Sequence, residues 1–216
     1  MFGGHVNTDN ASVPVVSVGI VNRYVALEGV DGSGKSTLAI SLAEHLEALG
    51  ESVIVVREPG GTDVGETIRT LLLESETLDD WTEALLFAAQ RAELARRVVA
   101  PALASGTWVI SDRTYYSSMA YQGHARGLGV SEVRRINETG LQGVVPGVVF
   151  VLDTDPEEGL ARQHRADRIG GEGLEFQKRV RDGYMALALG EPEKVHVLDG
   201  SLSVESLTAA ILGRIL

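Results

Sequence analysis

The chain has 216 residues, of which 44% are hydrophobic and 23% are charged, a composition typical of one globular enzyme domain with a sizeable core. Its formal net charge of -11 disfavours a nucleic-acid polymer as partner, because phosphate backbones repel an acidic protein. The sequence has no cysteine, which excludes disulfides, zinc–thiolate sites and thiol catalysis. No apolar run approaches the ~20 residues that span a bilayer, and no secretory signal is evident, so we expect a cytoplasmic protein without a membrane partner.

The first 21 residues differ in composition from the rest of the chain. Residues 1–10 are polar and rich in glycine and asparagine, and the β-like run 13–21 is interrupted by Pro14 and Gly19. This pattern favours a disordered extension over an added edge strand. We therefore predict an N-terminal extension over residues 1–21 and a single domain over residues 22–216.

From residue 23 onward, short runs rich in valine and isoleucine alternate with segments of helical periodicity. The predicted strands are 24–27, 52–56, 107–110, 148–152 and 195–198. The predicted helices are 35–49, 64–73, 83–104, 156–164 and 174–189. This alternation predicts an α/β fold in three layers, with a five-stranded parallel sheet flanked by helices on both faces. Ligands of such sheets bind beyond the carboxyl ends of the strands, so the residues that follow each strand are the candidates for a site.

The segment after the first strand carries the most specific motif. It reads Gly29-Val30-Asp31-Gly32-Ser33-Gly34-Lys35-Ser36 and matches the P-loop pattern G-x-x-x-x-G-K-[ST]. Glycines let backbone N–H groups point inward around phosphate oxygens, and the N-terminus of the next helix adds partial positive charge. We expect the Lys35 ammonium to lie along the β- and γ-phosphates of ATP and the Ser36 hydroxyl to ligate Mg²⁺.

A P-loop alone does not distinguish a kinase from a GTPase switch or a motor protein. The guanine-reading tetrapeptide Asn-Lys-x-Asp is missing from the sequence, and the D-x-x-G match at 167–170 follows a helix instead of a strand. The chain is also too short for the additional domains of a large motor ATPase. A kinase is therefore favoured over a nucleotide-binding switch.

Charged and aromatic residues follow the second strand. Arg57 and Glu58 precede a proline and two glycines, which force a tight loop at the rim of the expected site. Arg69, in the next helix, is by itself typical of a solvated surface charge. Phe87 and Arg91 are one i, i+4 step apart, so they share a helix face. They could stack on a base and donate to its carbonyl, although the spacing alone favours a core phenylalanine with an arginine beside it.

The third predicted strand leads into Asp112 and Arg113. An aspartate at the end of a buried strand beside a P-loop can hold Mg²⁺ through its water shell, and the arginine can offset charge on a transferring phosphoryl group. A structural Asp112–Arg113 pair is the alternative. Asp153 follows the fourth strand and competes for the metal, but the next residues, 154–156, are typical of a helix cap and a first-turn proline, so we prefer Asp112.

Three arginines, Arg162, Arg165 and Arg168, lead into the glycine-rich run 169–173. This combination indicates a lid over about residues 162–174 that closes over phosphates and excludes water. A flexible basic surface loop is the alternative.

In their order and spacing, these motifs resemble those of the thymidylate kinases, over residues 23–216. The resemblance rests on segments 27–37 and 57–62, on Phe87 with Arg91, on Asp112-Arg113, and on segment 120–123. It implies a homodimer that transfers the γ-phosphoryl group of ATP to dTMP, with Mg²⁺, and yields dTDP and ADP for dTTP synthesis. Kinases for dUMP or dCMP, and a non-catalytic nucleotide-binding switch, are the alternatives.

The resemblance also implies roles for the matching positions. ATP would be held by Gly29, Val30, Asp31, Gly32, Ser33, Gly34, Lys35, Ser36 and Thr37, and the metal by Ser36 and Asp112. The acceptor nucleotide would be bound by Glu58, Pro59, Arg69, Phe87, Arg91, Arg113, Ser118 and Gln122. Phosphoryl transfer would involve Lys35, Arg113, Asp31, Glu58 and the lid arginine Arg168.

Two positions depart from the family pattern or mark a subtype. The neutral Gly32 beside Asp31 resembles the bacterial type, in which the lid carries the arginine. Thr114 stands where many members have a tyrosine after Asp-Arg, so recognition of the ribose by that residue would be lost or moved to Tyr115 or Tyr116.

Overall fold

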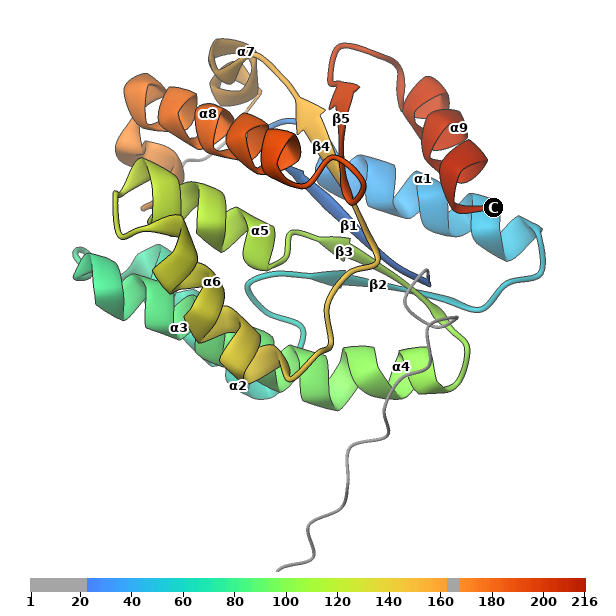
Figure 1. The fold of residues 1–216 in the computed structure, drawn as a ribbon, viewed down its shortest axis with the longest axis horizontal. Helices are drawn as coiled ribbons and strands as arrows, with labels where there is room; N and C mark the ends of the chain where they lie inside the picture. The colour runs from blue at the N-terminus through green and yellow to red at the C-terminus, as the bar shows by residue number, and fades with distance from the viewer. Residues whose placement is uncertain (1–22, 163–167) are drawn as a thin grey trace, which may run out of the picture.

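The computed structural model describes residues 23–162 and 168–216 (Figure 1). The predicted extension over residues 1–21, and Arg165 in the predicted lid, lie outside the described residues. The strands are β1 (Tyr24–Gly29), β2 (Val53–Arg57), β3 (Trp108–Asp112), β4 (Val148–Asp153) and β5 (Val195–Asp199). They form one five-stranded parallel sheet in the order β2-β3-β1-β4-β5. The predicted fold class and all five predicted strands are confirmed, with strand ends shifted by one or two residues.

Nine α-helices surround the sheet within the described ranges. They are α1 (Lys35–Ala48), α2 (Asp63–Glu74), α3 (Asp80–Leu94), α4 (Ala100–Ala104), α5 (Tyr115–Ser118), α6 (Val130–Leu141), α7 (Pro156–Ala161), α8 (Leu174–Gly190) and α9 (Val204–Ile215). The π-helical turns η2 (Ala95–Val99) and η3 (Met119–Ala125) follow α3 and α5, and a 3₁₀ turn, η4 (Gly170–Glu172), precedes α8.

Capping residues explain where several helices begin. The helix predicted over 83–104 starts at Asp80 instead, because the side chain of Asp79 accepts hydrogen bonds from the backbone N–H groups of Trp81 and Thr82. The predicted cap before α7 is confirmed, since the Asp155 side chain accepts from the next turn. α7 ends at Ala161, before the predicted end at residue 164.

Three helices, α5, α6 and α9, were not predicted from the sequence. In α6 the fully buried side chains are Val133, Asn137 and Leu141, spaced four residues apart on an otherwise polar helix. A stripe this narrow, with an asparagine in it, gives little periodic signal, and the helix is stabilised by packing against α3 and η3.

The helices form two layers, one on each face of the sheet (Figure 1). On one face Val25 and Leu27 of the central strand pack against α1 and α9. On the other face Ala26 packs under α5, η3 and α8, and the β2–β3 edge is covered by α3, η2 and α4. β1 is buried along its whole length, as expected for the middle strand of a covered parallel sheet.

The parallel register gathers the strand ends. Leu27 of β1 lies opposite Asp112 of β3, and Asp112 lies opposite Arg57 of β2. The P-loop, the loop after β2 and the segment after β3 therefore begin side by side at one edge of the sheet.

Candidate nucleotide-binding site

A cavity of about 630 Å³ lies at this edge, a volume typical of small-molecule sites. It is lined by the predicted residues Asp31, Gly32, Gly34, Lys35, Ser36, Thr37, Glu58, Pro59, Arg69, Phe87, Asp112, Arg113, Ser118 and Gln122, and by Arg57, Leu73, Ser117, Tyr121, Arg162 and Ile169. The structure thus brings most of the predicted site residues together. The predicted residues that do not line the cavity are Gly29, Val30 and Ser33 of the P-loop, and Arg91 and Arg168.

The P-loop has a backbone that requires glycine at Gly32. Its φ is +75°, and a Cβ at this position would lie 2.0 Å from the carbonyl oxygen of Gly159 in α7. Any side chain at this position would displace α7. The neutral residue in the loop therefore follows from the close packing of α7 on the P-loop.

The Lys35 side chain lies within the P-loop. Its ammonium donates to the carbonyl oxygens of Gly29 (3.2 Å) and Val30 (2.8 Å) and to the hydroxyl of Ser33 (3.1 Å). Burial, together with the nearby guanidinium of Arg113, lowers the pKa of Lys35 to about 8. The ammonium is thus still mostly protonated at neutral pH and is held at the phosphate-binding loop by acceptors that ATP oxygens could replace.

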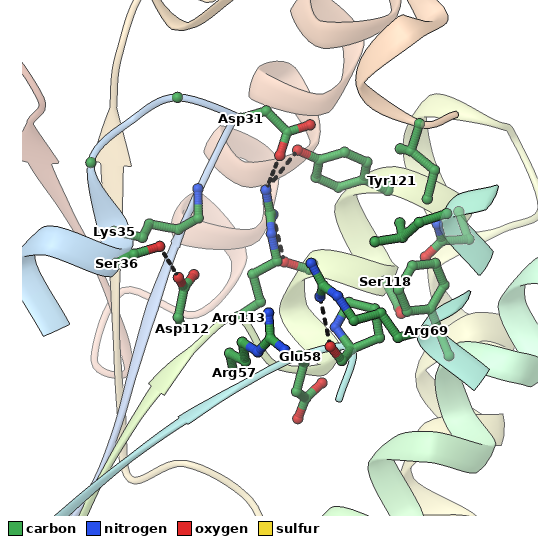
Figure 2. Close-up of a pocket in the computed structure, with 18 of the residues that line it drawn as sticks. Asp31, Lys35, Ser36, Arg57, Glu58, Arg69, Asp112, Arg113, Ser118 and Tyr121 are labelled. Carbon is green, nitrogen blue, oxygen red and sulfur yellow. Dashed lines mark hydrogen bonds and ion pairs between the residues drawn. The ribbon is translucent and has the colours of Figure 1, made fainter. Parts of the chain in front are cut away.

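The two predicted metal ligands face each other across the start of α1 (Figure 2). The Ser36 hydroxyl donates to a carboxylate oxygen of Asp112 at 2.5 Å, and both side chains line the cavity. Asp153, the competing candidate, is paired instead with Arg181 through two hydrogen bonds of 2.5 and 2.8 Å. Among the described residues no group of three or more His, Cys, Asp or Glu side chains could hold a metal. One hydroxyl and one carboxylate fit Mg²⁺, which keeps several waters and takes phosphate oxygens as its other ligands.

Arg113 is fixed between the P-loop and the helical layer. Its guanidinium forms an ion pair with Asp31, as Figure 2 shows, and donates to the Gly29 carbonyl (3.3 Å) and the Ser117 hydroxyl (3.1 Å). It also lies over the Tyr121 ring, 5.1 Å from the centroid. Burial would raise the pKa of Asp31, but Arg113 and then Lys35 outweigh it and hold that pKa below its usual range.

Glu28, which the sequence analysis did not single out, organises the residues around Arg113. Its side chain is fully buried and accepts hydrogen bonds from Thr114 (backbone N–H and hydroxyl, both 2.7 Å), Ser117 (2.6 Å) and Tyr184 (2.9 Å). Ser117 and Tyr184 in turn contact Arg113. A glutamate inside an otherwise apolar strand was the one signal in the sequence that could have identified it.

Thr114 therefore has a structural explanation, because it binds Glu28 with both its backbone and its side chain. The expectation that Tyr115 or Tyr116 recognises the ribose is wrong. Both side chains are buried in the core, neither lines the cavity, and the Tyr116 hydroxyl donates to Glu191 at 2.7 Å. Tyr121 is the tyrosine that lines the cavity.

Phe87, Ser118 and Gln122 are part of the cavity lining, as predicted. Arg91 lies behind them, almost fully buried. Its guanidinium forms hydrogen bonds with Glu58, Asn137 and Ser118, the last at 3.1 Å. Phe87 and Arg91 therefore do not act on the cavity together, because the aromatic ring lines the cavity while the arginine is held by buried acceptors.

Glu58 and Arg69 both line the cavity (Figure 2). Burial raises the pKa of Glu58, opposed by the adjacent Arg91. The Arg69 guanidinium donates to the carbonyl oxygen of Pro59 at 2.7 Å, and the Glu58–Pro59 peptide bond is cis. Arg69 therefore contributes a positive charge to the cavity, in contrast to the solvated surface position that its sequence alone suggested.

The two described arginines of the predicted lid have different surroundings. Arg162 lines the cavity and forms a solvent-exposed ion pair of 3.1 Å with Glu158. Arg168 donates to the buried Glu83 at 2.7 Å and to the Leu72 carbonyl at 3.0 Å, away from the cavity lining. Of these two, Arg162 is the one placed to meet phosphates.

Comparison with known proteins is consistent with this geometry. Residues 27–211 match the Thymidylate kinase family. The chain is 44% identical over 185 residues to the thymidylate kinase of Caldanaerobacter subterraneus subsp. tengcongensis, covering 84% of this chain and 89% of that protein. It is 48% identical over 185 residues to the thymidylate kinase of Pelotomaculum thermopropionicum, covering 83% and 86% respectively. The crystal structure of thymidylate kinase from Ehrlichia chaffeensis superposes with a TM-score of 0.76 at 30% identity, covering 89% of this chain and 98% of that one. The chain therefore belongs to the thymidylate kinase family.

Proposed function

We infer that the protein transfers the γ-phosphoryl group of ATP to the 5′-phosphate of dTMP, and that it releases dTDP and ADP. As a member of this family, it is a dTMP kinase with ATP as the phosphate donor. The observation that supports this function is that one cavity is lined by the P-loop lysine, a second cation (Arg69) and an aromatic ring (Phe87). One nucleotide on the P-loop and a second between the other two residues would account for all three.

For the donor, backbone N–H groups of the P-loop and the Lys35 ammonium would hold the β- and γ-phosphates. Ser36 and Asp112 would hold Mg²⁺ through their oxygens. Bound there, the ion would neutralise charge on the phosphate oxygens. The 2.5 Å contact between the two side chains keeps both oxygens at the same point of the cavity wall.

For the acceptor, Arg69 would bind the 5′-phosphate, because its guanidinium is positioned in the cavity by the Pro59 carbonyl. Phe87 would stack on the base, with Ser118 and Gln122 at its edge. Arg91 hydrogen-bonds Glu58 and Ser118 and would position both side chains at the acceptor nucleotide.

Arg113 lies at the P-loop, on the same cavity as the two phosphate sites, where it can stabilise charge on the phosphoryl group in transfer. Asp31 and Ser117 fix its orientation beforehand, so little reorganisation is needed during the reaction. Arg162 would add a further charge when the lid residues approach. No covalent intermediate is required.

A coupled assay of ADP release with a panel of nucleoside monophosphates tests this function. We expect the highest kcat/KM with dTMP. A higher kcat/KM with dCMP, or ATP binding without ADP release for every monophosphate, would contradict it.

We also propose that the protein acts in the cytoplasm as a homodimer. Val64 and Leu71 on α2, and Trp81 and Leu85 on α3, are large apolar side chains that are exposed in the single chain, and the two helices pack against each other. No helix in the described ranges is long and apolar enough to cross a membrane. Light scattering after gel filtration should give twice the mass of the chain, and Trp81→Glu with Leu85→Glu should halve it.

A further inference from the structure

Glu83, on α3, is a fully buried carboxylate beside the cavity. One of its oxygens accepts from the Gln122 amide (2.8 Å) and from Nε of Arg126 (2.7 Å). The other oxygen accepts from a second nitrogen of Arg126 (3.0 Å) and from Arg168 (2.7 Å). Two donors at each oxygen fill the usual acceptor positions of a carboxylate.

These contacts fix the orientation of the Gln122 amide. A carboxylate held by two guanidinium groups only accepts hydrogen bonds, so the amide must turn its NH₂ group toward Glu83. A flipped amide would place its oxygen against the oxygen of Glu83 and lose a buried, charge-assisted hydrogen bond. Because Gln122 lines the cavity, the amide atom left for a ligand is its carbonyl oxygen, a hydrogen-bond acceptor.

Ser118, close to Gln122, has a proton that it can donate. Its hydroxyl oxygen accepts from Arg91 (3.1 Å), and a guanidinium cannot accept in return. The serine proton is thus left for an acceptor on the ligand. Ser118 and Gln122 are four residues apart in the run from α5 into η3, so a donor and an acceptor stand next to each other on one helical face.

We propose that Glu83 is a specificity-determining positioning residue, which makes the site read the imide edge of a pyrimidine. Thymine and uracil present a C4 carbonyl acceptor and an N3–H donor, which match the Ser118 proton and the Gln122 oxygen. Cytosine presents an unprotonated N3, which opposes the Gln122 oxygen. Ser118 does not discriminate in this way, because its hydroxyl oxygen has a second lone pair for the amino group, so the selection against cytosine rests on the Gln122 amide that Glu83 orients. This inference rests on the proposed position of the acceptor base between Phe87 and Gln122.

The test compares Glu83→Gln with the double variant Glu83→Gln, Gln122→Glu. In the single variant, Arg126 and Arg168 both donate to the one amide oxygen of Gln at position 83, so the NH₂ group of that side chain turns toward Gln122. The Gln122 amide then flips to accept from it, and presents its own NH₂ group to the base. We expect the ratio of kcat/KM for dTMP to that for dCMP to fall at least about tenfold. In the double variant the carboxylate at position 122 can only accept, and the ratio should recover most of the loss. dUMP is the matched control, because its imide edge is that of dTMP, so the ratio of dTMP to dUMP should not change.

Both variants leave Arg126 and Arg168 without a carboxylate at position 83, so we expect a lower Tm in both. The test therefore depends on the ratio of kcat/KM values and not on the Tm. An unchanged dTMP-to-dCMP ratio in the single variant, or no recovery in the double variant, would overturn the role of Glu83. Should Glu83→Gln not fold, Gln122→Met keeps Glu83 and removes the acceptor, and it should lower the same ratio. A retained ratio in that variant would also overturn the proposal, whereas a wild-type protein that does not phosphorylate dTMP would contradict the function itself.

Discussion

Replacing Arg113 separates its chemical contribution from its backbone strain. The residue has φ +75°, in the left-handed region, where a side chain costs about 1 kcal/mol relative to glycine. Arg113→Ala removes the guanidinium and keeps the strain, whereas Arg113→Gly removes both. The two variants should therefore lose the same catalytic contribution but differ in stability.

The magnitude follows from the contacts of the guanidinium. It is a half-buried cation that is ion-paired to Asp31 and directed at the P-loop by Gly29 and Ser117. Loss of one prepositioned donor of this kind lowers kcat by about 10²–10³. Arg113→Gly should be more stable than Arg113→Ala by about 1 kcal/mol, or roughly 2–4 °C in Tm for a chain of this size.

The assay is steady-state ADP release at saturating ATP and dTMP, with thermal unfolding of the same preparations. Arg97→Ala is the control, because Arg97 is exposed and pairs only with Glu93 at 3.2 Å among the contacts described, and it should leave kcat unchanged. Loss of a charge-stabilising donor should lower kcat far more than about threefold. A kcat within about threefold of wild type in either Arg113 variant would therefore refute the role of Arg113 in phosphoryl transfer. An Arg113→Ala variant as stable as Arg113→Gly would refute the strain.

Three further predictions follow from the cavity. The pKa of Lys35, which burial and Arg113 lower to about 8, should make kcat/KM for ATP fall as pH rises through 8. Between pH 8 and the ordinary lysine pKa of 10.5 the unfolded state binds more protons than the native state, so the free energy of unfolding of the ligand-free protein should rise with pH over this range. Lys35→Met should abolish both slopes. Asp112→Asn should raise the Mg²⁺ concentration for half-maximal activity by about tenfold, whereas Asp153→Asn should not, as a Mg²⁺ titration would show. Arg162→Ala should lower kcat by about tenfold, because it removes one charge from the phosphate side. Arg168→Ala should instead lower the free energy of unfolding by about 2 kcal/mol in a denaturant titration, since its partner Glu83 is a buried carboxylate. A large loss of kcat in Arg168→Ala, with a loss of stability alone in Arg162→Ala, would contradict these two roles.

Features that depend on local geometry could be predicted from the sequence. The P-loop could be recognised because its glycines, lysine and serine work through the backbone of a single turn, within eight positions of each other. The strands could be predicted because a buried parallel strand needs a continuous apolar run, and the cap at Asp155 because its hydrogen bond spans two residues. The parallel order then placed Asp112 near Ser36 without further information.

The contacts of the longer side chains could not be predicted, because they depend on packing between distant parts of the chain. The hydrogen-bond partners of Arg91 are 23 to 46 positions away along the chain, and that of Gln122 is 39 positions away. The partners of Glu28 are 86 to 156 positions away. Spacing within one helix identifies a shared face, but it does not show which side chain reaches a cavity and which is held behind it. A buried charged group needs a partner, and the packed chain supplies carboxylates for Arg91 and Arg168. Held by these partners, the two arginines do not line the cavity.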